Sequence, residues 1–333
     1  MSRREIRQEA KPPWSAVPRA VKDEIGRILG SPVRAATRVY GGYAPSATFR
    51  LVLRDRRRAF VKSTYPLPPR SPVVWGIADE ERVYRAAARR IRPWAPQCFG
   101  SFEIGGWRGL VLEDVGPADV PPWTARSVGR AARDYAAFHA RNLGMGPTAV
   151  ITGTLWHLFV DRWPKASLER VASLARGHED EALEWLDVAY PLLREAGPRL
   201  VRARSRRTLL HLDTRSDNIR VRPGLRLFDW NFACVGPREL DVAAFAQSIT
   251  AEAGPAPERF VAAYRERLDL DDRLLALAAG AIAGLFAQRA PEPPLPELPR
   301  LRSVQRRQLK ASLAWFARMA SLAEPRWLRA VPD

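Results

Sequence analysis

The 333-residue sequence has very few cysteines and no long apolar segment. Its two cysteines, Cys98 and Cys234, are too few for a disulfide framework, so we expect a reducing, cytoplasmic environment. The longest uncharged apolar run, 274–287, is shorter than the roughly 20 residues that a membrane-spanning helix needs. The charged residues 1–13 lack the apolar stretch of a signal peptide. We therefore expect the run to form a buried helix and the protein to have no membrane partner.

Acidic side chains are scarce relative to basic ones. The chain has 36 Asp and Glu against 54 Lys and Arg, a formal net charge of +18. Such a balance is typical of proteins that bind nucleic acid or an anionic surface. The arginines are scattered along the chain, however, and a coding preference for Arg, Ala and Pro explains that distribution as well as a nucleic-acid groove does. We therefore favour a protein without a nucleic-acid partner and keep a basic nucleic-acid-binding protein as the lesser alternative.

The order of the expected elements indicates an α+β fold with two regions of different character. Residues 35–115 alternate like a small antiparallel sheet that carries one helix, whereas helical periodicity dominates residues 116–333. Residues 1–34 form an N-terminal extension that contains a helix. The expected strands are 37–40, 47–53, 59–63, 99–104 and 110–113, and the expected helices are 18–29, 79–91, 125–141, 156–176, 179–195, 241–251, 257–267, 271–289 and 303–322.

Most of the chemically informative side chains lie in one strand-like segment, residues 208–232. Two apolar residues lead into His211 and Asp213, and Asn218 follows five residues after Asp213. Further on, the runs 219–222 and 225–228 alternate on either side of a Pro-Gly dipeptide. That spacing predicts a hairpin with a two-residue turn.

Counting outward from this turn places Asn218 opposite Asp229. Directly opposed residues have Cβ atoms about 5 Å apart, so an amide oxygen and a carboxylate could share one hard divalent cation. Mg²⁺ takes few protein ligands and binds substrate phosphates as well. We therefore predict a Mg²⁺ site at Asn218 and Asp229, with Asp213 beside it to accept a proton from a hydroxyl group.

These residues resemble a known enzyme family. His-x-Asp, then four residues and Asn, with Asp-Trp at a hairpin end, is similar to the catalytic and metal-binding loops of the aminoglycoside phosphotransferases. These are small-molecule kinases with a protein-kinase-like fold. The resemblance implies two lobes, a nucleotide-binding sheet lobe and a larger, mainly helical lobe with the catalytic loop and the substrate site. It also implies transfer of the γ-phosphate of ATP or GTP to a hydroxyl of a small molecule.

In the sheet lobe, the resemblance implies a set of nucleotide-binding residues. The set comprises the two glycines and the serine of a degenerate phosphate loop, the lysine of the third strand, the helix glutamate that pairs with this lysine, and the residue at the adenine hinge. They are Gly41, Gly42, Ser46, Lys62, Glu80 and Glu113.

In the helical lobe, the resemblance implies that Asp213 orients and deprotonates the acceptor hydroxyl while His211 braces the loop. Asn218 and Asp229 would hold Mg²⁺ against the nucleotide phosphates. Asp241 lies in a segment similar to the family's Gly-x-Pro-x-x-Asp-Leu-Ala element, and it would hydrogen-bond the loop backbone from a helix start.

Several features of the sequence bear on the loop path, on the class of acceptor and on whether the protein is active. Leu212 stands where family members usually carry Gly, so we expect the loop path to differ. Only eleven residues separate Asp229 from Asp241, which leaves no room for the activation segment of a protein kinase and favours a small-molecule acceptor. Because every polar residue that catalysis needs is present, we favour an active enzyme over a non-catalytic nucleotide-binding relic. The net charge favours a neutral or singly charged acceptor over a polycationic antibiotic.

Overall fold

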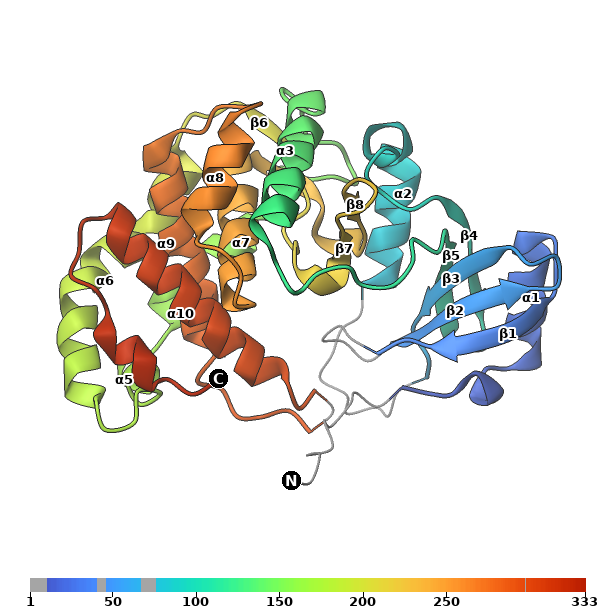
Figure 1. Cartoon of the computed structure of the whole chain (residues 1–333), viewed down its shortest axis with the longest axis horizontal. Helices are drawn as coiled ribbons and strands as arrows, with labels where there is room; N and C mark the ends of the chain where they lie inside the picture. The colour runs from blue at the N-terminus through green and yellow to red at the C-terminus, as the bar shows by residue number, and fades with distance from the viewer. Residues whose placement is uncertain (1–10, 41–45, 67–75, 297) are drawn as a thin grey trace. The chain divides into compact units, whose positions relative to one another are not determined.

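A computed structural model of the chain describes residues 11–40, 46–66, 76–296 and 298–333. These residues form two units, each with its own core (Figure 1). Unit 1 comprises the described residues up to Pro117, with the segments Arg226–Asn231 and Leu295–Pro299. Unit 2 comprises Ala118–Leu225, Phe232–Pro294 and Arg300–Asp333. The α+β class expected from the sequence is confirmed, because the strands concentrate in unit 1 and the helices in unit 2.

Unit 1 is built on a five-stranded antiparallel sheet with the strand order β1-β2-β3-β5-β4. The central strand β3 pairs with β2 on one side and β5 on the other, so that Lys62 lies between Thr48 and Leu110. Successive side chains of a strand point to opposite faces, so the side chains of Val61 and Lys62 lie on opposite faces of the sheet. The strands are β1 Val33–Arg38, β2 Ala47–Leu53, β3 Arg58–Ser63, β4 Cys98–Ile104 and β5 Trp107–Leu112.

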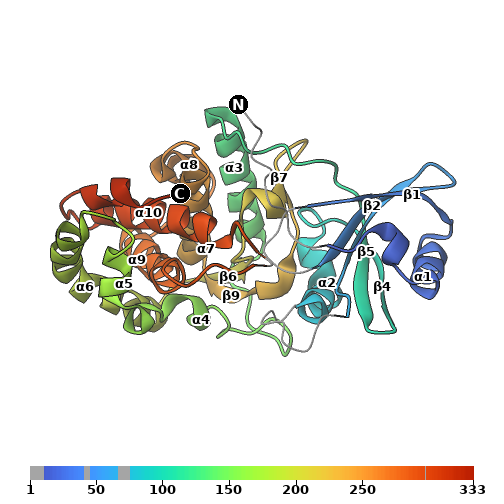
Figure 2. The same cartoon turned by 90° about the horizontal axis from the view of Figure 1, so that it is seen from below.

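Two helices pack in unit 1. Helix α1 (Arg19–Leu29) contacts β4, β5 and β1 (Figure 2), and its buried residues Val21, Ile25 and Leu29 join the apolar core with Val61 of the sheet. Helix α2 (Ile77–Ile91) contacts β5 and buries an unusual pair of acids, Glu80 and Glu81, together with its apolar face. The sheet thus buries apolar residues of α1 and carboxylates of α2.

Helices α7 and α9 form the centre of unit 2. Almost every residue of α7 is buried, and α9 packs against α6, α7 and α10. The apolar run 274–287 lies within α9 and is largely buried, which confirms the expected buried helix. The longer helices are α3 Ala125–Arg141, α6 Glu179–Arg202, α7 Arg238–Ala251, α8 Pro257–Arg265, α9 Asp272–Arg289 and α10 Leu301–Met319.

The single helix expected at 156–176 was wrong. The segment instead forms α4 (His157–Val160), a 3₁₀ turn at Trp163–Lys165 and α5 (Leu168–Ala172). Pro164 lies in that turn, and proline lacks the backbone N–H that would continue a helix. The next helix, α6, runs seven residues beyond the expected end at 195, because tertiary packing outweighs Pro198 within it.

The loop of interest follows a short strand in unit 2. Strand β6 (Arg207–Leu210) pairs antiparallel with β9 (Cys234–Pro237), with Leu210 opposite Cys234. Helix α7 begins directly after β9 and packs against β6. Between them lie β7 (Ile219–Arg220) and β8 (Arg226–Leu227). Within the described part of the chain, no helix combines the length and apolarity needed to cross a bilayer.

Candidate active site

The loop after β6 is held by a buried carboxylate of α7. Asp241 accepts hydrogen bonds from two consecutive backbone amides, with His211 N 2.7 Å from Oδ2 and Leu212 N 2.7 Å from Oδ1. The side chain of His211 is itself fully buried, and its Nδ1 lies 3.3 Å from the backbone nitrogen of Asp213. Both oxygens of Asp241 are therefore used to fix the path that leads to Asp213.

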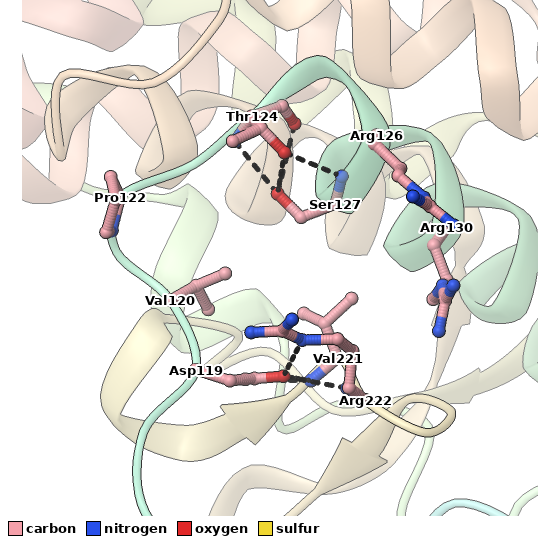
Figure 3. A pocket seen from close by; sticks show the side chains of 9 residues that line it. All are labelled: Asp119, Val120, Pro122, Thr124, Arg126, Ser127, Arg130, Val221 and Arg222. Carbon is pink, nitrogen blue, oxygen red and sulfur yellow. Dashed lines mark hydrogen bonds and ion pairs between the residues drawn. The ribbon is translucent and has the colours of Figure 1, made fainter.

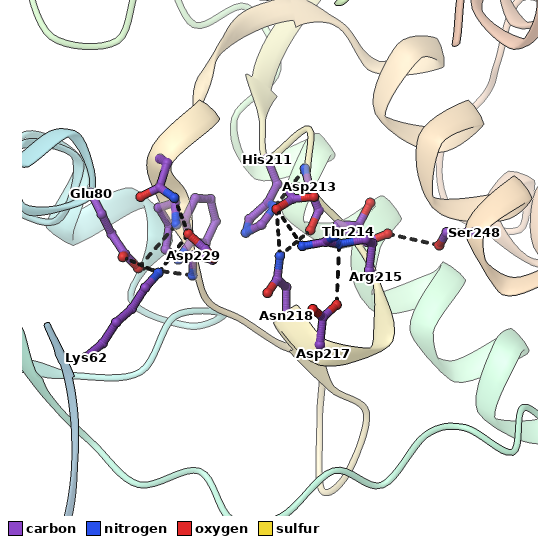
Figure 4. A network of polar contacts seen from close by, with 12 residues as sticks. Lys62, Glu80, His211, Asp213, Thr214, Arg215, Asp217, Asn218, Asp229 and Ser248 are labelled. Carbon is purple, nitrogen blue, oxygen red and sulfur yellow. Dashed lines mark hydrogen bonds and ion pairs between the residues drawn. The ribbon is translucent and has the colours of Figure 1, made fainter. Parts of the chain in front are cut away.

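Asp213 is held in turn by groups of its own loop (Figure 4). The amide nitrogen of Asn218 donates to Oδ2 of Asp213 at 2.8 Å and to its backbone carbonyl at 2.9 Å. The guanidinium of Arg215 also contacts Oδ2, at 3.1 Å, and lies 3.4 Å from Asp217. The structure thus brings together His211, Asp213 and Asn218, three of the residues that the sequence singled out.

The backbone at Leu212 has a conformation that glycine adopts more easily than leucine. Its φ is +63°, in the left-handed region, where a Cβ crowds the backbone. The side chain is nevertheless 92% buried, since its exposed fraction is 8%. Leu212 therefore occupies a left-handed backbone position with a buried side chain, and the expected difference in loop path stays a prediction.

Asp241 is supported by two further helices. His139 of α3 contacts its Oδ2 through Nε2 at 3.2 Å, and the other ring nitrogen lies 2.7 Å from the hydroxyl of Tyr264 in α8. Burial alone would raise the pKa of Asp241, but the hydrogen bond and charge of His139 and the backbone amide of His211 outweigh it and hold the pKa below its ordinary 3.8. The loop is thus fixed to an ionised carboxylate.

A second polar cluster lies in unit 1 (Figure 4). The ammonium of Lys62 is 2.8 Å from Oε2 of Glu80 and 2.7 Å from Oδ1 of Asp229. The other oxygen of Glu80 accepts the backbone amides of Asp229 and Trp230 at 3.0 and 3.3 Å. Asp229 has φ +72°, which places it in a tight bend after β8. The structure therefore brings Lys62, Glu80 and Asp229 into one group, in which Lys62 and Glu80 are buried and Asp229 is partly exposed.

Charge pairing decides the ionisation of this cluster. Burial would lower the pKa of Lys62, but the carboxylates of Asp229 and Glu80 outweigh it, and the pKa lies above its ordinary value. Burial and the nearby Asp229 raise the pKa of Glu80 against the opposing effect of Lys62. The neighbouring Glu81 pairs with Arg108 and Ser101 instead, so Glu80 is the glutamate that contacts the lysine.

The structure says less about the other residues that the resemblance assigns to nucleotide binding. Glu113 directly follows β5 and accepts the backbone amide of Gln97 at 3.1 Å, while Asp114 pairs with Arg50 at 3.3 Å. Ser46 is buried at the start of β2. Gly41 and Gly42 lie outside the described residues.

A family model described as the phosphotransferase enzyme family matches residues 35–278. The chain belongs to this family. The family match spans the Lys62 cluster, the loop from His211 to Asn218 and Asp241. No curated protein sequence matches the chain significantly.

Solved structures named as kinases or phosphotransferases have the same fold at low sequence identity. An aminoglycoside phosphotransferase from Alicyclobacillus acidocaldarius is 16% identical, with a TM-score of 0.57, covering 97% of this chain and 91% of that one. The choline kinase LicA from Streptococcus pneumoniae is 14% identical (TM-score 0.51; 93% and 98%). The amicoumacin kinase hAmiN, in complex with AMP-PNP and Ca²⁺, is 12% identical (TM-score 0.53; 83% and 87%). The predicted protein-kinase-like fold is confirmed.

In this family member, β7 and β8 pair as a two-stranded sheet, but the predicted two-residue turn between them was wrong. Five residues, not two, separate β7 from β8. The backbone amides of Val221 and Arg222 donate to the carboxylate of Asp119, at 3.1 and 2.8 Å, and that of Leu225 donates to Asp134 at 3.1 Å. These side chains take the amides that a two-residue hairpin would have used. The opposition of Asn218, in unit 2, to Asp229, in unit 1, stays a prediction.

The same Asp119 lines a cavity of about 380 Å³ in unit 2 (Figure 3). Arg126, Arg130 and Arg222 contribute to its wall, with the N-terminal cap of α3 formed by Thr124 and Ser127. Among the described residues that the sequence singled out, none lines this cavity.

Sequence reasoning missed several residues that contact the loop network, among them Arg215 and His139. Arg215 was detectable, because it stands two residues after Asp213 within the motif itself. The sequence pattern of α3 favours a packed position for His139, and the residue is indeed buried, but its contact with Asp241 spans 102 residues and no local pattern reveals it. Long-range polar partners of this kind require the tertiary structure.

Because the backbone at Leu212 is left-handed, glycine at this position should be more stable than alanine, which reverses the usual order of these two variants. Leu212→Ala loses the buried side chain and keeps the backbone strain, whereas Leu212→Gly relieves the strain. We expect the glycine variant to be more stable than the alanine variant by about 1 kcal/mol in urea unfolding. At Leu210, a buried residue of β6, alanine should be the more stable variant. Equal stability of the two variants at position 212 would contradict the strain.

The ionised, buried Asp241 predicts a loss of stability on neutralisation. Asp241→Asn turns one acceptor oxygen into an NH₂ group that faces a backbone N–H, so we expect a loss of about 2–4 kcal/mol at pH 7. Because the folded-state pKa of Asp241 is lowered, its contribution is full above the ordinary value of 3.8 and is lost as the pH falls through the folded-state value. The stability difference between the two proteins should therefore shrink in acid. A difference that does not change with pH would refute this origin.

Proposed function

We propose that the protein is a Mg²⁺-dependent kinase that transfers the γ-phosphate of ATP or GTP to a hydroxyl group of a small molecule. One observation carries the proposal: the carboxylate of Asp213 is held by Asn218 and Arg215 in a loop that Asp241 anchors. A base in a phosphoryl-transfer enzyme needs a fixed orientation, because such catalysis is mostly positioning and charge neutralisation.

The proposed reaction balances without a further reactant. The acceptor hydroxyl gives its proton to the carboxylate of Asp213 as its oxygen forms a bond to the γ-phosphorus. The bond between the γ-phosphorus and the bridging oxygen breaks, and the nucleoside diphosphate leaves. Arg215, which contacts Asp213, is a cation suited to the charge that collects around the transferred group.

The nucleotide would be bound by the cluster of unit 1. Lys62 is buried and ionised, and its two carboxylate partners fix the position of its ammonium group. In this position the ammonium group can still contact a phosphate. In this proposal Lys62 contacts the α- and β-phosphates and Glu80 orients Lys62. Gly41, Gly42 and Ser46 would contribute the phosphate loop, and Glu113 the hinge.

The proposed metal ligands suit Mg²⁺ by their chemistry. Mg²⁺ prefers oxygen donors and needs few of them from the protein when phosphates supply the rest. The amide nitrogen of Asn218 is used by Asp213, so its amide oxygen is the atom offered to a cation. Asp229 supplies a carboxylate. When bound, Mg²⁺ would neutralise charge on the nucleotide phosphates.

A small acceptor fits the segment that follows Asp229. The eleven residues before Asp241 are filled by a 3₁₀ turn at Trp230–Phe232, by β9 and by the start of α7. A peptide-binding activation segment has no place there. The neighbours named as kinases of choline, amicoumacin and aminoglycosides support an acceptor of this size.

The acceptor need not carry several positive charges. Of the acidic residues of α6 that could receive amines, Glu179 is half-buried and the others, Asp180, Glu184 and Asp187, are exposed, as on any solvent-facing helix surface. With the net charge of +18, this favours a neutral or singly charged hydroxyl compound over a polycation.

The first test is a screen for nucleotide consumption. ATP and GTP are each offered with aminoglycosides, macrolides, amino alcohols and sugars, and product is detected as a mass increase of one phosphate. With the acceptor found, Asp213→Asn should lower kcat by about 10²–10⁴-fold and leave nucleotide affinity unchanged, because only the proton acceptor is lost. Asp187→Asn, at an exposed site on α6, is the control. Turnover by Asp213→Asn at the wild-type rate would remove Asp213 from this role.

The metal assignment has a separate test. Asp229→Asn keeps a residue type that tolerates positive φ, so we expect it to fold and to lose the Mg²⁺-dependent part of its nucleotide affinity. Calorimetric titrations with AMP-PNP, in Mg²⁺ and in EDTA, measure that part. Asp79→Asn, at an exposed carboxylate of the same unit, should behave like wild type. An unchanged difference between Mg²⁺ and EDTA in Asp229→Asn would contradict the assignment.

A further inference from the structure

Helix α7 contacts the catalytic loop at three points, not one. At its first turn Asp241 accepts the amides of His211 and Leu212. Two turns later the hydroxyl of Ser248 lies 3.0 Å from the carbonyl oxygen of Thr214 (Figure 4). At its C-terminal end Glu252 accepts the hydroxyl of Ser216 at 2.7 Å. The loop thus runs along the helix, and each contact holds a later loop residue.

Glu252 has a second partner far away in the sequence. The indole N–H of Trp123 donates to Oε2 of Glu252 at 2.8 Å, while Ser216 uses Oε1. Trp123 is buried, packs edge-on against Phe245 of α7, and lies so close to Gly254 that a Cβ there would meet its side chain at 2.8 Å. The carboxylate therefore joins three segments of unit 2 at one place.

It is informative that the residue at position 252 is a glutamate. Burial, with a smaller effect from Asp217, raises the pKa of Glu252 despite the hydrogen bonds from Trp123 and Ser216. Glu252 is partly buried, and a carboxylate in such a place is seldom the most stable choice, since an apolar residue of similar volume avoids the desolvation cost. A carboxylate does, however, offer an acceptor oxygen to each of two donors. The geometry at Glu252 uses both.

Ser216 connects Glu252 to the residues that hold Asp213. It lies between Arg215, which contacts Asp213, and the residues Asp217 and Asn218. The backbone amide of Asn218 donates to the carbonyl of Arg215 at 2.9 Å, which closes a turn around Ser216. Fixing the hydroxyl of Ser216 therefore fixes the turn that presents Asn218 to Asp213.

We propose that Glu252 is a positioning residue for phosphoryl transfer, which holds the turn at Ser216 so that Asn218 and Arg215 keep the carboxylate of Asp213 in its reactive orientation. Glu252 touches neither substrate nor nucleotide in this proposal, and it acts through Ser216. The inference rests on the proposed kinase function for its kinetic consequence, but not for its effect on the loop.

The effect on the loop is measured without any substrate. In hydrogen–deuterium exchange of the full chain, Glu252→Ala should raise the exchange rate of the amides of 213–218 at least about tenfold, while the amides of α9 keep their rates. Ser216→Ala removes the same hydrogen bond from the other side and should reproduce the effect. Unchanged exchange at 213–218 in both variants overturns the proposal, whether or not the protein proves to be a kinase.

The kinetic effect separates positioning from general stability. Glu252→Ala should lower kcat by about 10–100-fold, while the nucleotide affinity measured in EDTA changes less than about twofold, because a small displacement of the reacting groups is costly and the metal-independent nucleotide contacts proposed for unit 1 do not involve Glu252. Glu252→Gln can accept from Trp123 through its oxygen and donate to Ser216 through its nitrogen, so kcat should stay within about threefold of wild type. Glu258→Ala, at an exposed glutamate paired with Arg318, is the matched control and should have no effect.

A double variant completes the design. If Glu252 acts through Ser216, the double variant Glu252→Ala with Ser216→Ala should lose no more kcat than Glu252→Ala alone. Additive losses, or a Glu252→Gln variant as slow as Glu252→Ala, overturn the proposed route. Absence of nucleotide turnover in the wild-type protein would instead overturn the proposed function, and the exchange experiment would still decide the role of Glu252 in the loop.

Discussion

The site in unit 2 depends on one interaction, the acceptance of two consecutive backbone amides by the buried carboxylate of Asp241. Without it, the N–H groups of His211 and Leu212 would be buried without partners, and the loop would have to open to satisfy them. Helices α3 and α8 contribute His139 and Tyr264 to the same point. The orientation of Asp213 is therefore a property of the helical core and not of the loop alone.

Unit 1 contains a buried positive charge, which carboxylates stabilise. Lys62 sits on the central strand of the sheet, where a lone buried ammonium would be strongly disfavoured, and two carboxylates keep it ionised. Glu80 in addition accepts the backbone at Asp229 and Trp230, so one helix residue fixes both the lysine and the bend after β8. In each unit, a buried acid organises the backbone that carries a second acid.

Local patterns predicted the α+β class, most strands and the residues of the motif, because alternation, turn residues and spacing are local properties. They predicted the pairing of β7 with β8 but the wrong turn length at Pro223-Gly224, where Asp119 and Asp134 accept backbone amides from about 100 residues away. They also failed at 156–176, where one proline ended a run of helical periodicity. The contacts of His139 and Glu252 have no local signature at all. Prediction thus failed where side chains distant in sequence hydrogen-bond the backbone.

The distances along the chain between the anchors of the loop have a consequence for folding. His211 and Asp241 are 30 residues apart, and His139 lies 102 residues from its partner, so closing these contacts requires loops that are slow to form. A partly folded chain with α3 or α7 undocked would hold the whole motif in its sequence and still lack an oriented Asp213. Recovery of the native loop should consequently be among the last events of refolding, after the helices have assembled.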